Sequence, residues 1–125
     1  PVPNSELPSY YATADVFIGP SIISKGGDQE GFGLVFVEAI GSGCIPVASS
    51  LPNISDIIID GKTGFIVEKN SGKKIAQTVL YILDHPEKQK KIVIDGRKHV
   101  LEHFDWRVIS HKYKNLFKEI CGCTF

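Results

Sequence analysis

Three short apolar runs, separated by segments with helical patterns, limit the folds open to this chain more than any other feature. The runs lie at residues 15–19, 44–48 and 65–67 and are too short to form helices of ordinary length. Strands that are apolar along most of their length are typical of parallel sheets covered on both faces. The alternation of strand and helix therefore predicts an α/β fold with a parallel sheet and right-handed crossovers.

Two helices are expected in the N-terminal part of the chain. Ser5 is placed to cap a short helix that precedes the first apolar run. A second helix is expected over residues 33–40, and the sequence Gly-Ser-Gly at residues 41–43 is expected to end it.

The C-terminal half is expected to be helical throughout. Ser71 and Asp105 are suited to cap two helices, and Pro86 suits the first position of a third. The last helix carries an apolar stripe with helical spacing, formed by Trp106, Ile109, Tyr113, Phe117 and Ile120. Such a stripe on a small domain predicts self-association of the chain; the alternative is that the two preceding helices cover it.

Composition narrows the functional classes. The 125 residues hold 14 basic and 14 acidic side chains, so no net charge favours a nucleic-acid partner. No apolar run approaches the thickness of a bilayer. Cys44 reads as a small buried hydrophobic residue, and Cys121 and Cys123 lack the further ligands that a metal site needs. These features predict a reduced, cytoplasmic protein; peripheral association of the full-length protein with a membrane is the alternative.

The segment around two glycines carries the most functional information. Gly31 and Gly33 lie where a loop after the first strand turns into the helix of residues 33–40. Backbone N–H groups at a helix start, approached closely through glycine, form an anion site. Glu30 precedes the helix and is expected to face the same ligand from the loop.

Glu38 is the second acidic residue of this segment. Its neighbours in the helix are apolar on every side, which predicts that the helix and Glu38 are buried. A buried carboxylate needs hydrogen-bond partners, and two adjacent sugar hydroxyls match its two oxygens. A backbone cap or an ion pair with a lysine satisfies the carboxylate equally well, and both interpretations stay open from the pattern alone.

The two glutamates eight residues apart resemble the Glu-plus-seven-plus-Glu motif of glycosyltransferase family 4 and related retaining GT-B enzymes. Further segments resemble the same family, at residues 6–21, 38–47, 60–67 and 104–106. The resemblance thus extends over nearly the whole chain, which makes it more specific than any single motif.

The resemblance implies a fold and a domain organisation. Residues 1–125 would form a single partial domain, the nucleotide-sugar-binding half of a GT-B C-terminal domain, with a Rossmann-like parallel sheet followed by helices. The acceptor domain, and the first half of the donor domain with its pair of basic residues, would belong to parts of the protein outside this chain. The N-terminal domain of the same protein is therefore an expected partner.

The resemblance also implies a reaction. The full-length protein would transfer a hexosyl group from a UDP- or GDP-linked sugar to a glycan or lipid-linked acceptor with retention, without a metal or other cofactor. Glu30 would be the catalytic residue beside the donor sugar, and Glu38 would bind the ribose hydroxyls. The remaining donor contacts would come from Gly31, Phe32, Gly33 and Leu34.

The chain departs from the family pattern in two loops, and two alternative functions stay open. Pro52 and Asn53 stand where the family has two glycines, which affects contacts from that loop. The loop at residues 22–29 is long, and its Lys25 and Asp28 are expected to be solvated rather than to face the acceptor. The alternative functions are a non-catalytic nucleotide-sugar-binding module and another GT-B sugar enzyme, such as an epimerase.

Overall fold

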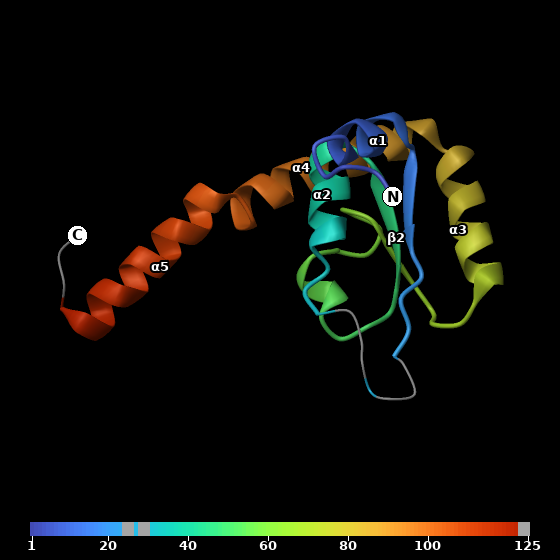
Figure 1. Ribbon diagram of the computed structural model, residues 1–125. Coiled ribbons are helices and arrows are strands. Elements are labelled where there is room, and N and C mark those ends of the chain that lie inside the picture. The colour runs from blue at the N-terminus through green and yellow to red at the C-terminus, as the bar shows by residue number, and fades with distance from the viewer. Residues whose placement is uncertain (24–26, 28–30, 123–125) are drawn as a thin grey trace.

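The computed structural model describes residues 1–23, 27 and 31–122. The described residues form, in chain order, α1 (Leu7–Thr13), β1 (Val16–Gly19), α2 (Leu34–Ser42), β2 (Ile45–Ser49), the 3-10 helix η1 (Ile54–Asp56), β3 (Phe65–Val67), α3 (Gly72–Leu83), α4 (Pro86–His103) and α5 (Trp106–Cys121). Figure 1 shows a central sheet with helices on both sides and α5 extending away from it.

The sheet is parallel, with the strand order β1-β2-β3. Val16 pairs with Ile45, and Val47 pairs with Phe65. The predicted parallel α/β sheet is confirmed. The strand predicted at residues 65–67 matches β3, while β1 and β2 each begin one residue later than expected.

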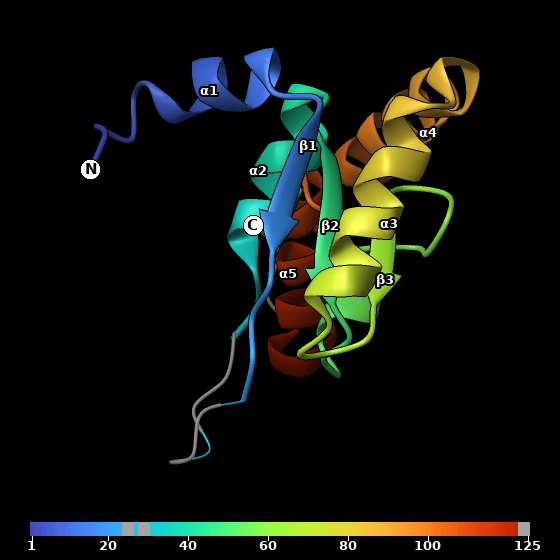
Figure 2. The same ribbon diagram turned by 90° about the vertical axis from the view of Figure 1, so that its right-hand side faces the viewer.

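Apolar side chains pack on both faces of the sheet because successive residues of a strand point to opposite sides. The cluster on one face includes Phe36, Ile40, Ala48 and Val100, contributed by α2, β2 and α4. The cluster on the other face includes Ile45, Val47, Val67, Ile82 and Ile92, contributed by β2, β3, α3 and α4. Figure 2 shows α2 and α3 on opposite sides of the sheet.

Helix ends follow the predicted signals with two exceptions. The side chains of Ser71 and Asp105 accept backbone N–H groups at the starts of α3 and α5, which confirms both caps. The expected Ser5 cap is wrong, because Glu6 is the N-cap of α1 and makes no side-chain cap bond in the described structure. The second helix continues to Ser42 and ends at Gly43, whose φ of 90° suits glycine.

Pro46 lies in the central strand, a place where proline normally removes a ladder hydrogen bond. Ile45 donates its N–H to Asp15 beside β1, so the missing N–H of Pro46 would face the β3 side. There β3 begins only at Phe65, opposite Val47. Gly64 allows the close approach, since a Cβ at this position would lie 2.9 Å from the Pro46 carbonyl oxygen.

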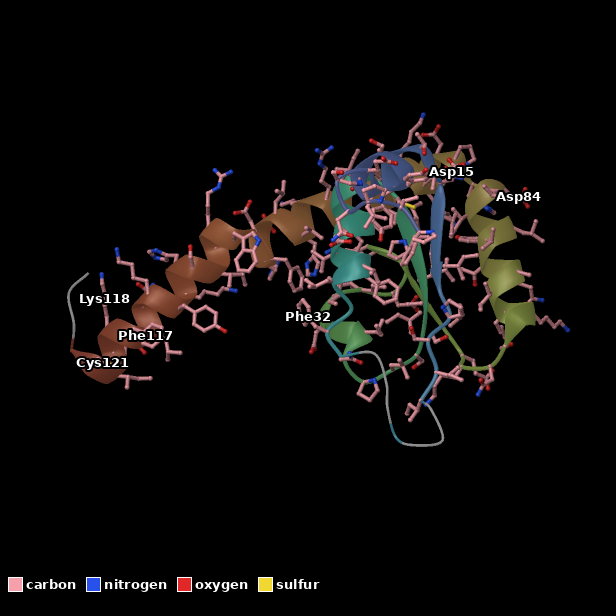
Figure 3. The ribbon with its side chains drawn as sticks, in the orientation of Figure 1. Asp15, Phe32, Asp84, Phe117, Lys118 and Cys121 are labelled. Carbon is pink, nitrogen blue, oxygen red and sulfur yellow. The ribbon has the colours of Figure 1, made fainter. Side chains whose placement is uncertain are left out.

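The helix α5 leaves the body of the domain after Phe104. None of its residues, all of which are described, is buried, and Trp106 is 84% exposed. Phe117 and Cys121 lie far from the sheet, as Figure 3 shows. The alternative that α3 and α4 cover the apolar stripe is therefore wrong. No helix in the described part of the chain is both long and apolar enough to cross a membrane.

We expect the 125-residue chain on its own to self-associate through α5, because Trp106, Ile109, Tyr113 and Phe117 form a continuous apolar surface. Sedimentation over a range of protein concentrations, with reductant present because Cys121 is exposed, measures the association. The double variant Tyr113→Ser, Phe117→Ser should shift the chain toward the monomer.

The matched control replaces His111 and Lys118 of the same helix, which do not line the apolar surface, by serine. This control should associate as the parent chain does. A parent chain that stays monomeric at high concentration, with the fluorescence of a buried indole at Trp106, would contradict the expectation.

Candidate functional site

The predicted donor segment lies at the carboxyl edge of the parallel sheet, where ligands bind in open α/β folds. The strands β1 and β2 end at Gly19 and Ser49, and residues 31–33 lead into α2 beside them (Figure 1). The side-chain amide of Asn53, in the loop after β2, donates a hydrogen bond to the Gly31 carbonyl oxygen. The loops after β1 and β2 are thereby joined.

Gly33 is the N-cap of α2 and sets the direction in which the helix starts. It is buried and has φ 80° and ψ 42°, in the left-handed region that favours glycine. Its carbonyl accepts the Phe36 N–H at 2.9 Å. Leu34 and Val35 are the first residues of the helix. At a helix start no earlier turn supplies a carbonyl partner for the backbone N–H groups, and the positive end of the helix dipole lies there. This arrangement suits a phosphate or another anion.

Phe36 anchors this helix start to the sheet. It is 1% exposed, and its ring packs edge-on against Phe17 of β1 with a centroid distance of 5.6 Å. A Cβ on Gly33 would lie only 2.9 Å from Cδ2 of Phe36. The position of the N–H groups at the start of α2 therefore depends on a tight contact between a glycine and a buried ring.

Phe32 and Leu34 flank Gly33 and are 49% and 61% exposed. The Phe32 ring packs near Phe104, at the end of α4, with a centroid distance of 5.9 Å. Figure 3 shows Phe32 beside the start of α2. Phe32 and Leu34 therefore present apolar surface on both sides of the buried Gly33.

Glu38 is exposed, so the prediction that it is buried is wrong. The inner face of α2 buries Phe36, Ala39 and Ile40. The outer face presents Leu34, Val35 and Glu38, because the sheet and α4 lie on one side of the helix only. Leu34 and Glu38 are four residues apart and share a face, with Glu38 about 6 Å further along the helix axis.

The outer face of α2 and the helix α1 enclose a pocket of ≈ 480 Å³. Its lining includes Leu7, Pro8 and Tyr11 of α1 and Val35, Glu38 and Ser42 of α2. The side chains of Tyr11 and Glu38 thus face each other across this pocket. Burial raises the pKa of the Tyr11 hydroxyl, and the Glu38 and Cys44 side chains raise that pKa further.

The sequence pattern does not mark Tyr11 as a site residue. A signal was present, since Leu7 and Tyr11 are four residues apart and are the half-buried residues of α1. This spacing marks the face of α1 that meets α2. It does not reveal that Tyr11 and Glu38 line one pocket, because that depends on how the two helices pack.

The structure describes only some of the other residues that the sequence analysis singled out. Glu30, Lys25 and Asp28 lie outside the described residues. Cys44 is 2% exposed, as expected of a small hydrophobic residue, and burial together with Asp15 raises the pKa of its thiol to about 11. Among the described residues, no group of three or more His, Cys, Asp or Glu side chains is arranged to hold a metal ion.

Comparison with known proteins assigns this chain to a family. The family model of glycosyl transferases group 1 matches residues 1–99. A GDP-mannose-dependent alpha-(1-6)-phosphatidylinositol monomannoside mannosyltransferase of Mycolicibacterium smegmatis is 34% identical over 107 residues, covering 85% of this chain and 28% of that protein. The chain thus spans less than a third of the length of this curated relative.

Solved structures agree with the fold. Sucrose-phosphate synthase from Thermosynechococcus elongatus superposes with a TM-score of 0.84 at 26% identity, covering 98% of this chain and 29% of that one. The C-terminal domain of a glycosyl transferase group 1 family protein from Francisella tularensis gives a TM-score of 0.70 at 27% identity, over 85% of this chain and 51% of that one. The fold is that of part of a GT-B C-terminal domain, and the chain belongs to the glycosyl transferases group 1 family.

Proposed function

We propose that the full-length protein containing this chain transfers a hexosyl group from a nucleotide-diphospho-sugar, UDP- or GDP-linked, to a glycan or lipid acceptor. We propose further that the anomeric configuration is retained. This chain supplies part of the donor site. Membership of the glycosyl transferases group 1 family supports the class of reaction.

One observation carries the assignment to a donor site. The helix α2 starts at a left-handed glycine at the carboxyl edge of the sheet, and Glu38 lies one turn further along the same exposed face as Leu34. An anion at the helix start and a carboxylate about 6 Å along the axis match the spacing of a diphosphate and a ribose. A nucleotide-diphospho-sugar combines both groups.

Each residue of the site is proposed to bind a different part of the nucleotide-diphospho-sugar. The backbone of Gly31, Phe32, Gly33 and Leu34 binds the distal phosphate and the sugar hydroxyls. Glu38 accepts hydrogen bonds from the ribose hydroxyls, and Glu30 positions the donor sugar. Preorganised N–H groups stabilise the diphosphate as it leaves, so that no divalent metal is needed. The acceptor attacks from the face that the phosphate leaves.

The chain is proposed to be a single partial domain over residues 1–125. Its coverage of less than a third of the mannosyltransferase supports this organisation. The remaining donor contacts and the acceptor site then come from other parts of the same protein. We propose that the full-length protein acts in the cytoplasm or peripherally at a membrane.

The full-length protein, incubated with UDP- and GDP-hexoses and with glycan or lipid acceptors, should form a glycosylated product. Mass spectrometry detects the added hexose, and the anomeric coupling constant in the NMR spectrum reports the configuration. The isolated 125-residue chain should form no product with the same substrates, because it holds only part of the donor site.

An inverted product would contradict retention. Rapid turnover by the isolated chain would contradict the proposal that the chain is a partial domain. Donor binding by the full-length protein without transfer to any acceptor class would instead favour a non-catalytic binding module.

A further inference from the structure

Tyr11 is held in place by a row of aromatic rings that crosses from α1 to α2. Its ring packs edge-on against Phe17 of β1, with a centroid distance of 5.5 Å and an interplanar angle of 84°. Phe17 packs in turn against the buried Phe36 of α2. The ring of Tyr11 is therefore held by packing, and it lines the same pocket as Glu38 on the outer face of α2.

Glu38 needs such a partner to have a defined orientation. An exposed glutamate has three rotatable side-chain bonds and populates several rotamers, which costs entropy when a ligand selects one of them. A charge-assisted hydrogen bond from a fixed phenol favours the rotamers in which the bond forms. A carboxylate offers about four lone-pair sites, so acceptor capacity remains for a ligand.

We propose that Tyr11 is a positioning residue of the donor site, whose hydroxyl orients the Glu38 carboxylate to accept hydrogen bonds from both hydroxyls of a ribose. The proposal rests on the proposed function. Tyr11 and Glu38 line the same pocket between α1 and α2, and its ≈ 480 Å³ lie within the range of small-molecule sites.

The chemistry of the ligand follows from this arrangement. A preoriented carboxylate distinguishes a ribonucleotide, which presents two adjacent hydroxyls, from a 2′-deoxynucleotide, which presents one. The contribution of Tyr11 should therefore appear as a preference for ribose. A general effect on the fold would change the affinity for both nucleotides alike.

The test measures the Kd of the full-length protein by calorimetry for UDP and 2′-deoxy-UDP, or for GDP and 2′-deoxy-GDP if the guanine nucleotide binds. Tyr11→Phe removes the hydroxyl and retains the ring. It should weaken ribonucleotide binding by roughly 3- to 10-fold and change deoxynucleotide binding by less than about twofold. Tyr10→Phe, at an exposed neighbour on the same helix, is the matched control and should change neither Kd.

A double-mutant cycle ties the effect to Glu38. Glu38→Gln alone should weaken ribonucleotide binding, and adding Tyr11→Phe in that background should produce little further change, because Tyr11 acts through Glu38. Equal weakening for both nucleotides would overturn the inference. An unchanged Kd of the Tyr11→Phe variant, or additive effects of the two substitutions on the Kd, would also overturn it. Tighter ribonucleotide binding by Tyr11→Phe would overturn it as well, because it would mean that Tyr11 competes with the ribose.

The cycle also separates this inference from the function on which it rests. If Glu38→Gln weakens ribonucleotide binding and Tyr11→Phe does not, only the role of Tyr11 is wrong. If the wild-type protein binds neither UDP nor GDP, or Glu38→Gln leaves the Kd unchanged, the proposed donor site itself is wrong.

Discussion

Replacing Glu38 by alanine in the full-length protein is expected to weaken binding of the nucleotide-sugar donor by roughly 10- to 150-fold. A hydrogen bond to a charged group contributes about 1.5–3 kcal/mol where a ligand excludes water, and each 1.4 kcal/mol corresponds to about tenfold in Kd. Calorimetric titration with UDP, GDP or the donor itself measures the effect. Glu87→Ala, which removes an exposed carboxylate at the start of α4, is the control and should leave the Kd unchanged.

Glu30 and Glu38 are expected to differ in the step that each affects. Glu30→Ala is expected mainly to reduce kcat, by roughly 100-fold if the donor sugar loses its orientation, with a smaller change in donor Kd. The difference follows from the proposed roles, since one carboxylate holds the nucleoside and the other the reacting sugar. A donor Kd that is unaffected by Glu38→Ala would remove the main argument for the site.

Replacing Gly33 by alanine is expected to destabilise the start of α2 by about 1–3 kcal/mol. A residue with a Cβ loses about 1–2 kcal/mol in the left-handed region. The added Cβ would also lie 2.9 Å from Cδ2 of the buried Phe36 ring. Hydrogen exchange at the amides of α2, measured by mass spectrometry, should show faster opening of the helix. Donor affinity should fall as well, because the first N–H groups of α2 turn away from the ligand.

Gly31→Ala is the matched control, two residues earlier in the same loop. Its φ is not in the left-handed region, and no described atom lies within 4 Å of the added Cβ. Exchange in α2 should then match that of the wild-type protein. Equal effects of the two substitutions would show that the left-handed conformation of Gly33 is not what determines the start of the helix.

The elements of this fold were predictable because their signals are local. Each strand is a short apolar run between polar turns, and the caps at Ser71 and Asp105 involve backbone groups two or three residues away. The left-handed Gly33 at the start of α2 falls in the glycine-containing segment that the sequence marks as an anion site. The proposed roles of Glu30 and Glu38 in binding and catalysis stay predictions.

The exposure of Glu38 could not be derived in this way. Apolar composition indicates that a helix has a preference for burial, but burial also needs neighbouring elements on every side. A sheet of three strands together with α4 covers only the inner face of α2, so that Leu34, Val35 and Glu38 remain accessible. The inference from an apolar helix to a buried carboxylate therefore fails at this position.

The sequence by itself determined which segments form strands and helices, where the glycine-bounded start of α2 lies, and that α5 carries an apolar stripe. Only the tertiary structure decided which side chains meet at the site. The Asn53 amide meets the Gly31 carbonyl across 22 positions of the chain, and Tyr11 of α1 lines one pocket with Glu38 of α2. Local patterns do not encode such pairs, because the contacts depend on how segments far apart in the chain pack together, as α1, β1 and α2 do through Tyr11, Phe17 and Phe36.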